Sequence, residues 1–254
     1  MMPDPIFLNI HMYGIMIAIG VLCAFATLFA VAKKKSIDGK FTDLVFYNGL
    51  VSIAVGFGSA ALFQAVYDYI ENPSAGFHFN GGLTFIGGLI GGVICFLLIY
   101  AFYRRKYTAR LYQVISILPC SILIAHAFGR VGCFFAGCCY GKETDSLLGV
   151  QFPDLPNPVH PTQFYEAAFL FVMFAICLYL VIKKDFKHNL SIYLITYGIF
   201  RFFLEYLRDD HRGALVGSIS PSQFWSLLMI VAGVAVFFIV KCIYRKAAKD
   251  ETVS

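Results

Sequence analysis

Charge is scarce in this chain of 254 residues. Charged residues make up 14% of it, whereas globular domains have about 25%. Hydrophobic residues make up 59%, compared with roughly 45–50% in such domains. A water-soluble fold could not bury so much apolar surface, and the composition also excludes a disordered or collagen-like chain, a disulfide-stapled secreted module and a DNA-binding domain. We conclude that the chain is an integral membrane protein. We expect the lipid bilayer as a partner and no nucleic-acid partner.

Common cofactor and metal motifs are also missing. The sequence has neither a GxGxxG motif on a βαβ unit nor a P-loop, so we predict no cofactor. Cys133, Cys138 and Cys139, here called the cysteine trio, lack the paired CxxC pattern of a structural zinc site, so we predict no metal. Metal binding with His126, a disulfide from Cys133 to Cys138 or Cys139, and a catalytic thiol stay open as alternatives.

Long apolar stretches dominate what is present. A helix needs about 20 such residues to cross about 30 Å of hydrocarbon. The stretches lack the two-residue alternation of membrane barrel strands, so helices are the remaining way to satisfy the backbone in lipid. The sequence therefore predicts one all-α, polytopic integral membrane domain over residues 1–254. Its seven transmembrane helices are expected at Ile10–Ala32, Leu44–Ala65, Gly82–Tyr103, Leu111–Phe128, Gln163–Ile182, Leu190–Leu207 and Ser222–Ile243.

The basic residues predict the orientation of these helices. Most of the 20 lysines and arginines follow the first, third, fifth and seventh stretches, which all end on one side of a seven-helix chain. Because basic residues favour the cytoplasmic side, we expect the N-terminus outside and the C-terminus in the cytoplasm. The exceptions fall at outer helix ends or in outer loops, where topology does not explain them: Arg130, Lys142, Arg201, Arg208 and Arg212.

Charged residues at two outer helix ends are candidates for chemistry. Arg201, Glu205 and Arg208 are spaced to share one helical face, and His126 and Arg130 are also one turn apart. A charge at such depth costs about 2.5–3.5 kcal/mol and usually faces a partner or a watery cavity. A structural Arg201–Glu205 ion pair, with Arg208 reaching to the headgroups, is one interpretation. A shared site for a phospholipid phosphate is the other, and we favour it because guanidinium groups suit phosphate.

A long connection, residues 129–161, is expected on the outer side, and loops of this length are usually functional. It leads into the motif HPTQFYEA, where His160 precedes Pro161 and a helix start. Gln163 and Glu166, three residues apart, are expected to face the same way. Simple capping, with Glu166 favouring the helix N-terminus, is the alternative.

Two further segments have both a structural and a functional interpretation. Tyr13 lies near the outer end of the first stretch, where a lone tyrosine usually belongs to the aromatic belt. The segment GGLTFIGGLIGG, residues 81–92, begins the third stretch. Glycine at that density indicates close helix packing or backbone amides accessible to a ligand.

Together, these motifs resemble the prolipoprotein diacylglyceryl transferase family, whose signature reads approximately G-R-x-G-N-F-x-N-G-E-x-x-G. The segment GRVGCFFAGCCYG is a divergent form of it. The resemblance extends in order through Tyr13-Gly14, GGLTFIGG, HPTQFYE, RFFLEYLR and SPSQFWSLLMIVAG. It implies a seven-helix enzyme of the bacterial plasma (inner) membrane. Such an enzyme transfers diacylglycerol from phosphatidylglycerol to the lipobox cysteine of a lipoprotein precursor, and these two molecules are the expected partners.

The resemblance also implies roles for individual residues. Arg130 and Arg201 match the essential arginines of the family, and two fixed guanidinium groups would stabilise a phosphate-bearing leaving group. With the candidates from the residue pattern, the predicted catalytic set is Arg130, Arg201, Tyr13, His126 and Glu205. The predicted substrate-binding set is Arg208, Gly141, Cys133, Cys138, His160, Gln163 and Glu166.

Four positions depart from the family pattern. Ile86 stands where the family has a histidine, so a candidate base is missing. Cys133 and Ala136 stand at the two asparagine positions of the signature, and Cys138 stands at its glutamate.

The departures leave two other hypotheses open. His126, one helical turn before Arg130, and His160 are the candidates to replace the missing base. A related transferase with a different acceptor could use the cysteine trio instead. A phospholipid-binding membrane protein without turnover is the hypothesis from another class.

Overall fold

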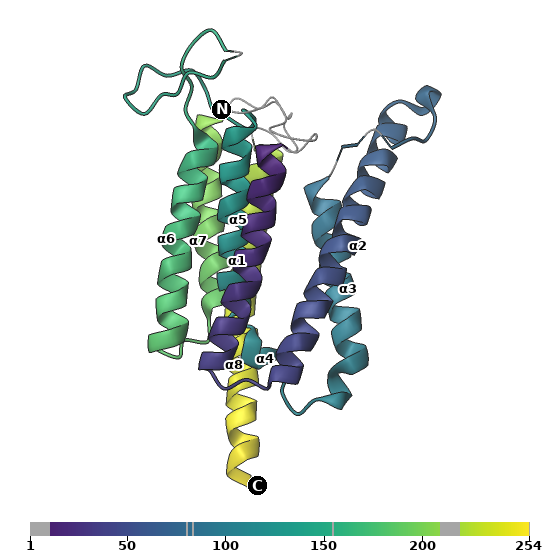
Figure 1. The fold of residues 1–254 in the computed structure, drawn as a ribbon, viewed down its shortest axis with the longest axis vertical. Coiled ribbons are helices and arrows are strands. Elements are labelled where there is room, and N and C mark those ends of the chain that lie inside the picture. Colours follow the sequence, from purple (N-terminus) through teal and green to yellow (C-terminus); the bar gives the residue numbers. More distant parts are fainter. Residues whose placement is uncertain (1–10, 80, 83, 154, 209–218, 254) are drawn as a thin grey trace. The chain divides into compact units, whose positions relative to one another are not determined.

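The computed structural model in Figure 1 describes residues 11–253 except 80, 83, 154 and 209–218, so Arg212 lies outside the described residues. All regular elements in this part of the chain are helical, and seven helices are long and apolar enough to cross a membrane. The predicted all-α, polytopic class is confirmed. The seven helices are α1 (Met12–Lys34), α2 (Gly39–Glu71), α3 (Phe85–Tyr103), α5 (Leu118–Phe135), α6 (Thr162–Lys183), α7 (Asn189–Leu204) and α8 (Pro221–Val253).

The helices form two compact units. The first contains α1, α5, α6, α7 and α8 with the short α4 (Leu111–Val114), and the second contains α2 and α3. In the second unit, glycines let the two helices touch, since a Cβ on Gly56 would lie 3.0 Å from the carbonyl oxygen of Gly88. Close packing is therefore the structural role of the glycine-rich segment. The single domain over residues 1–254 stays a prediction.

Helix α5 has a central position in the first unit. It packs against α1 and α6 and also contacts α7, while α7 packs against α8. Glycine again permits the approach, because a Cβ on Gly20 of α1 would lie 3.0 Å from the Ala125 carbonyl oxygen of α5. Side chains of α5 can therefore meet residues from three other helices.

One end of the first unit, here called the Asp185 end, gathers basic residues. The Asp185 carboxylate pairs with Lys35, which caps α1, and lies 2.6 Å from the Nζ of Lys187. Hydrogen bonds from Lys187 and Lys35 lower the pKa of Asp185. The segments that follow α1 and α6 thus meet at one end, as the basic pattern predicted. The side of the membrane that this end faces stays a prediction.

The structure changes the fourth predicted helix. The stretch Leu111–Phe128 divides into α4 and α5, and α5 continues to Phe135. The connection therefore begins at Ala136, not at residue 129, and Cys133 belongs to the last turn of α5. Glycine suggested a loop here, but Gly132 packs on α1, where a Cβ would lie 3.1 Å from the Tyr13 ring. Tertiary packing outweighs the weak helix propensity of glycine.

Candidate functional site

Three spans of the first unit bring polar side chains to Glu166, and this region is here called the Glu166 end. The Glu166 carboxylate of α6 is completely buried. Its Oε1 accepts a hydrogen bond of 2.6 Å from the Tyr197 hydroxyl of α7. The same oxygen lies 3.0 Å from the Nε of Arg130 and 3.6 Å from the Nε2 of His126, both on α5. A buried carboxylate needs such partners, because an isolated charge in a low-dielectric interior is very costly.

Helical spacing explains how these side chains meet. His126 and Arg130 are one turn apart on the side of α5 that faces α6 and α7. Pro161 precedes the first residue of α6, which places Glu166 in its early turns. The shared face predicted for His126 and Arg130 is found, whereas their contact with Glu166 and Tyr197 follows from helix packing, which the spacing did not predict.

Next to this cluster lie polar atoms without a partner. Gln163, on the same helix as Glu166, is completely buried, and both its Oε1 and its Nε2 lack a hydrogen-bond partner among the described residues. The second carboxylate oxygen of Glu166, Oε2, also lacks one. An unsatisfied buried polar group costs about 1–3 kcal/mol, so these atoms are poised to interact with a ligand or water.

Arg130 retains free hydrogen-bonding capacity. Its Nε faces Glu166, and its side chain is 22% exposed. Within the described part of the chain, Nε meets Glu166 as an ion pair without a hydrogen bond, and the two terminal Nη atoms have no hydrogen-bond partner. The guanidinium is therefore held on one edge and available on the other.

Arg201 forms a second buried ion pair. Its Nη1 donates to Glu205 Oε2 at 2.7 Å, and its Nη2 donates to the Ser222 hydroxyl of α8 at 3.1 Å. The Ser220 hydroxyl donates to the other Glu205 oxygen at 2.9 Å. The structural ion pair considered for Arg201 and Glu205 is thus present. Arg201 also interacts electrostatically with Glu166, so both arginines act on the same buried carboxylate.

Arg208 does not share the helical face of Arg201, and that prediction is wrong. Helix α7 ends at Leu204, the short helix η3 spans Glu205–Leu207, and Arg208 is extended, with φ −86° and ψ 150°. It forms an isolated β-bridge with Gly141, and its buried guanidinium donates to the Cys139 carbonyl oxygen at 3.2 Å. The β-bridge with Gly141 satisfies backbone groups that another turn of helix would otherwise have satisfied.

Gly141 and His160 lie in the same bridged connection. A Cβ on Gly141 would overlap the Leu207 carbonyl oxygen and lie 2.8 Å from the Thr162 methyl group, so a glycine is required for packing. Its amide donates to the His160 carbonyl oxygen at 2.8 Å. The His160 ring lies 3.3 Å from the Tyr165 hydroxyl, a partner outside the Glu166 cluster. Their substrate-binding roles stay predictions.

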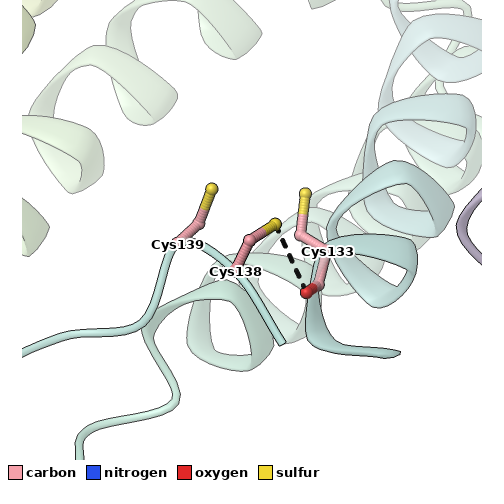
Figure 2. A group of neighbouring side chains, drawn as sticks. All are labelled: Cys133, Cys138 and Cys139. Atoms are coloured by element: carbon pink, nitrogen blue, oxygen red, sulfur yellow. Dashed lines mark hydrogen bonds between the residues drawn. The ribbon is translucent and has the colours of Figure 1, made fainter. Parts of the chain in front are cut away.

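The cysteine trio converges, as Figure 2 shows, with its sulfur atoms on one side. The three Sγ atoms lie within 4.8 Å of one another, and all three thiols are free. Cys133 lies in the last turn of α5, and the chain returns to it through residues with positive φ, 70° at Gly137 and 66° at Cys139. The Cys138 amide and thiol both donate to the Cys133 carbonyl oxygen, at 3.2 and 3.6 Å. This group could hold a metal ion.

Positive charge borders the trio. Hydrogen bonds from the Cys133 and Cys138 thiols, together with the Arg208 guanidinium, lower the pKa of Cys139. Arg130 interacts electrostatically with Cys133 and Cys139. Tyr13 also lies within electrostatic range of Cys133, Cys138 and Arg130. The trio and the Glu166 cluster are therefore neighbouring parts of one polar region.

Several members of this region were not predicted from the sequence. Tyr197 precedes Arg201 by one turn, so the spacing argument that selected Arg201 could have found it. Ser222 and Thr162 carried no such signal. Ser222 contacts Arg201 through the packing of α7 on α8, and the Thr162 hydroxyl donates to the Cys139 carbonyl oxygen at 2.8 Å across the long connection.

The fold and site define a polytopic membrane protein with a buried guanidinium–carboxylate cluster. The chain matches the family described as prolipoprotein diacylglyceryl transferase over residues 5–239. It belongs to this family, and the resemblance noted in the sequence is confirmed.

Curated relatives support this assignment over most of their length. A phosphatidylglycerol–prolipoprotein diacylglyceryl transferase of Clostridium tetani is 36% identical over 239 residues, which cover 91% of this chain and 93% of the relative. The transferase numbered 2 of Clostridium perfringens is 32% identical, covering 96% of each chain. The Bordetella bronchiseptica transferase is 32% identical, covering 91% of this chain and 90% of its own.

Proposed function

We propose that the protein transfers a diacylglyceryl group from phosphatidylglycerol to the cysteine thiol of a lipoprotein precursor, at the outer face of the bacterial plasma membrane. The names of the relatives state this donor and acceptor class, and the seven membrane-spanning helices suit a lipid substrate. The observation that carries the proposal is the geometry of Arg130. One edge of its guanidinium is held by the buried Glu166, and its other nitrogens, which have no hydrogen-bond partner among the described residues, can bind a phosphate.

The reaction needs stabilisation of a leaving anion. A carbon–sulfur bond forms between the acceptor thiolate and the glyceryl carbon, and the carbon–oxygen bond to phosphate breaks. The electron pair leaves with glycerol phosphate, which gains negative charge. Fixed cations aimed at that charge lower the barrier most effectively in a low-dielectric site.

In this proposal, Arg130 and Arg201 bind the phosphate and stabilise the departing charge. Their orientation is set before substrate binds, because Glu166 and Tyr197 anchor one while Glu205 and Ser222 anchor the other. Such preorganisation avoids reorienting dipoles during the reaction. The unpartnered amide of Gln163 supplies hydrogen bonds to the headgroup.

His126 accepts the thiol proton. Its Nε2 lies 3.6 Å from the Glu166 carboxylate, and its ring contacts the edge of Tyr197 with centroids 5.1 Å apart. A carboxylate beside one ring nitrogen orients a histidine and leaves the other nitrogen to act as base.

An assay of purified protein with phosphatidylglycerol and a lipobox peptide tests the proposal. We expect a thioether-linked peptide and glycerol phosphate in equal amounts, measured by mass spectrometry. Co-purified phosphatidylglycerol that is never consumed would support the lipid-binding alternative. Consumption of lipid without modification of the peptide would indicate a different acceptor. Either result would contradict the proposal.

A further inference from the structure

The arrangement of the cysteine trio matches the requirements of a thiophilic metal site. Tetrahedral zinc has Zn–S distances of about 2.3 Å, which place its sulfur ligands about 3.8 Å apart. The three Sγ atoms already lie within 4.8 Å of one another, so small side-chain rotations would suffice to coordinate one ion. Thiolate ligands select zinc over the hard cations calcium and magnesium.

Three ligands leave one coordination position open. Structural zinc sites have four protein ligands, whereas catalytic sites have three and keep the fourth position for water or substrate. No fourth cysteine, histidine or carboxylate joins the trio among the described residues. A site of this composition therefore fits an incoming ligand, and an acceptor cysteine is one more thiolate.

The surroundings suit a negatively charged zinc–thiolate centre. Three thiolates and one divalent zinc carry a net charge of −1. The buried Arg208 guanidinium lies beside Cys139, and Arg130 interacts electrostatically with Cys133 and Cys139. These cations offset the charge of the centre, and Arg130 links it to the proposed phosphate site.

The centre also lies on the reactive side of α5. His126, Arg130 and Cys133 are spaced by four and three residues along this helix and therefore share one face. A metal held by Cys133 would thus lie one helical turn from the proposed phosphate ligand Arg130 and two turns from the proposed proton acceptor His126, on the same face of α5.

We propose that Cys133, Cys138 and Cys139 bind one zinc ion, whose open position takes the acceptor cysteine as a thiolate. This inference rests on the proposed transferase function. Metal coordination deprotonates a thiol, whose unperturbed pKa is about 8.5. The centre would thereby activate the acceptor in a chain that has Ile86 at the position of the family histidine.

The step balances without a redox partner. On binding zinc, the acceptor thiol releases its proton to water, through which it reaches His126 two helical turns away. Its sulfur then forms a bond to the glyceryl carbon, while the carbon–oxygen bond breaks and the electron pair departs with the phosphate. Zinc stays divalent throughout. The thioether product is a weaker ligand than a thiolate and leaves the metal.

Metal content tests the site independently of activity. The full-length protein is purified under reducing conditions with zinc supplied and analysed by elemental mass spectrometry. We expect one equivalent in the wild type, less than one tenth in the Cys133→Ser/Cys138→Ser/Cys139→Ser variant, and one equivalent in the matched control Cys242→Ser, whose cysteine is exposed on α8. Cobalt in place of zinc should give a sulfur-to-metal charge-transfer band that the triple variant lacks.

Two results would overturn the site. One is a reduced wild-type protein without bound zinc, or a triple variant that retains it. The other is a disulfide within the trio in protein taken from its native membrane, detected as a mass two hydrogens lower in the peptides. Either outcome would mean that the cysteine trio has a role other than zinc binding.

Removing and restoring zinc separates this inference from the proposed function. Chelated protein should lose at least 100-fold in transfer rate and regain it with zinc. Full activity after complete zinc removal would overturn the metal step and leave the transferase proposal standing. Bound zinc in a wild-type protein without transferase activity would refute the proposed function, and with it the activation of an acceptor thiol.

Discussion

The two ends of the first unit use charge in different ways. At the Asp185 end, the ion pairs are at least partly exposed, and the Asp185 side chain is 61% accessible. At the Glu166 end, the carboxylate is completely buried and is shared by a guanidinium, a tyrosine and a histidine. Exposed pairs contribute little stability, whereas buried charges are costly unless partners or function retain them. The difference supports the proposal that chemistry takes place at the Glu166 end and not at the Asp185 end.

Two buried side-chain amides, one near each end of the first unit, show a similar difference. Asn189, near the Asp185 end, donates through Nδ2 to the carbonyl oxygens of Ser116 and Cys177, both at 3.0 Å, and only its Oδ1 lacks a partner among the described residues. Gln163, near the Glu166 end, is equally buried, but neither of its polar atoms has a partner in the described part of the chain. Asn189 thus connects three segments of the fold, whereas Gln163 has its hydrogen-bonding capacity unused.

Removing one cation from each end of the first unit should give the largest difference in transfer rate. Arg130→Ala should lower the transfer rate by about 10²–10³-fold, as expected for loss of one fixed group that stabilises the departing charge. Lys187→Ala removes a cation from an exposed pair and should change the rate less than about twofold. Initial rates with phosphatidylglycerol and a lipobox peptide measure both variants. Similar losses in the two would remove the functional distinction between the ends.

Replacing each of the two buried amides should affect stability in one variant and activity in the other. Asn189→Leu removes two buried hydrogen bonds to carbonyl oxygens and should destabilise the protein by about 1–3 kcal/mol. Gln163→Leu removes no side-chain hydrogen bond to a described residue and relieves unsatisfied buried atoms, so stability should stay the same or rise, while we expect activity to fall about tenfold, a loss of about 1.4 kcal/mol. Thermal unfolding and initial rates are measured on the same preparations. A large stability loss in Gln163→Leu alone would mean that this amide is structural.

Tyr197→Phe should have a smaller effect at the Glu166 end. It removes one hydrogen bond to the buried carboxylate, worth about 1.5–3 kcal/mol when the acceptor is charged. Arg130 and His126 remain beside Glu166, so we expect a loss near the lower limit of this range and a modest rate decrease. Thr196→Val, which loses a local hydroxyl bond to the Ile192 carbonyl oxygen on the same helix, is the control for α7. An equal rate decrease in the control would argue against a specific role of Tyr197.

The smallest effect is expected from acid at the Asp185 end. Because Lys187 and Lys35 lower the pKa of Asp185, its contribution to stability is present above the unfolded-state pKa of about 3.9 and is lost as the pH falls through the lower folded-state value. Exposure limits this contribution to about 1 kcal/mol or less. Wild type and Asp185→Asn should therefore differ slightly at neutral pH and converge in acid. A difference that grows on acidification would reverse the assigned sign.

Much of the Glu166 end could be predicted from local spacing. His126 and Arg130 share a face because they are four residues apart, and Gln163 and Glu166 are both buried because they are three apart on one helix. Local spacing placed Arg208 on the wrong face, because α7 ends at Leu204 and does not continue to Arg208. Gly129 and Gly132 were predicted to be loop residues, whereas α5 continues through both.

Sequence by itself determined the membrane class, the number of spans and the shared face of His126 and Arg130, because hydrophobic length and helical periodicity are local properties. Tertiary structure alone decided that Glu166 pairs with Arg130, that Ser222 anchors Arg201 and that three sulfur atoms converge. These contacts join side chains from different helices, or across a turn with positive φ, so they depend on how the helices pack and where each one ends. Such packing is a cooperative outcome of the whole unit, which no single segment encodes.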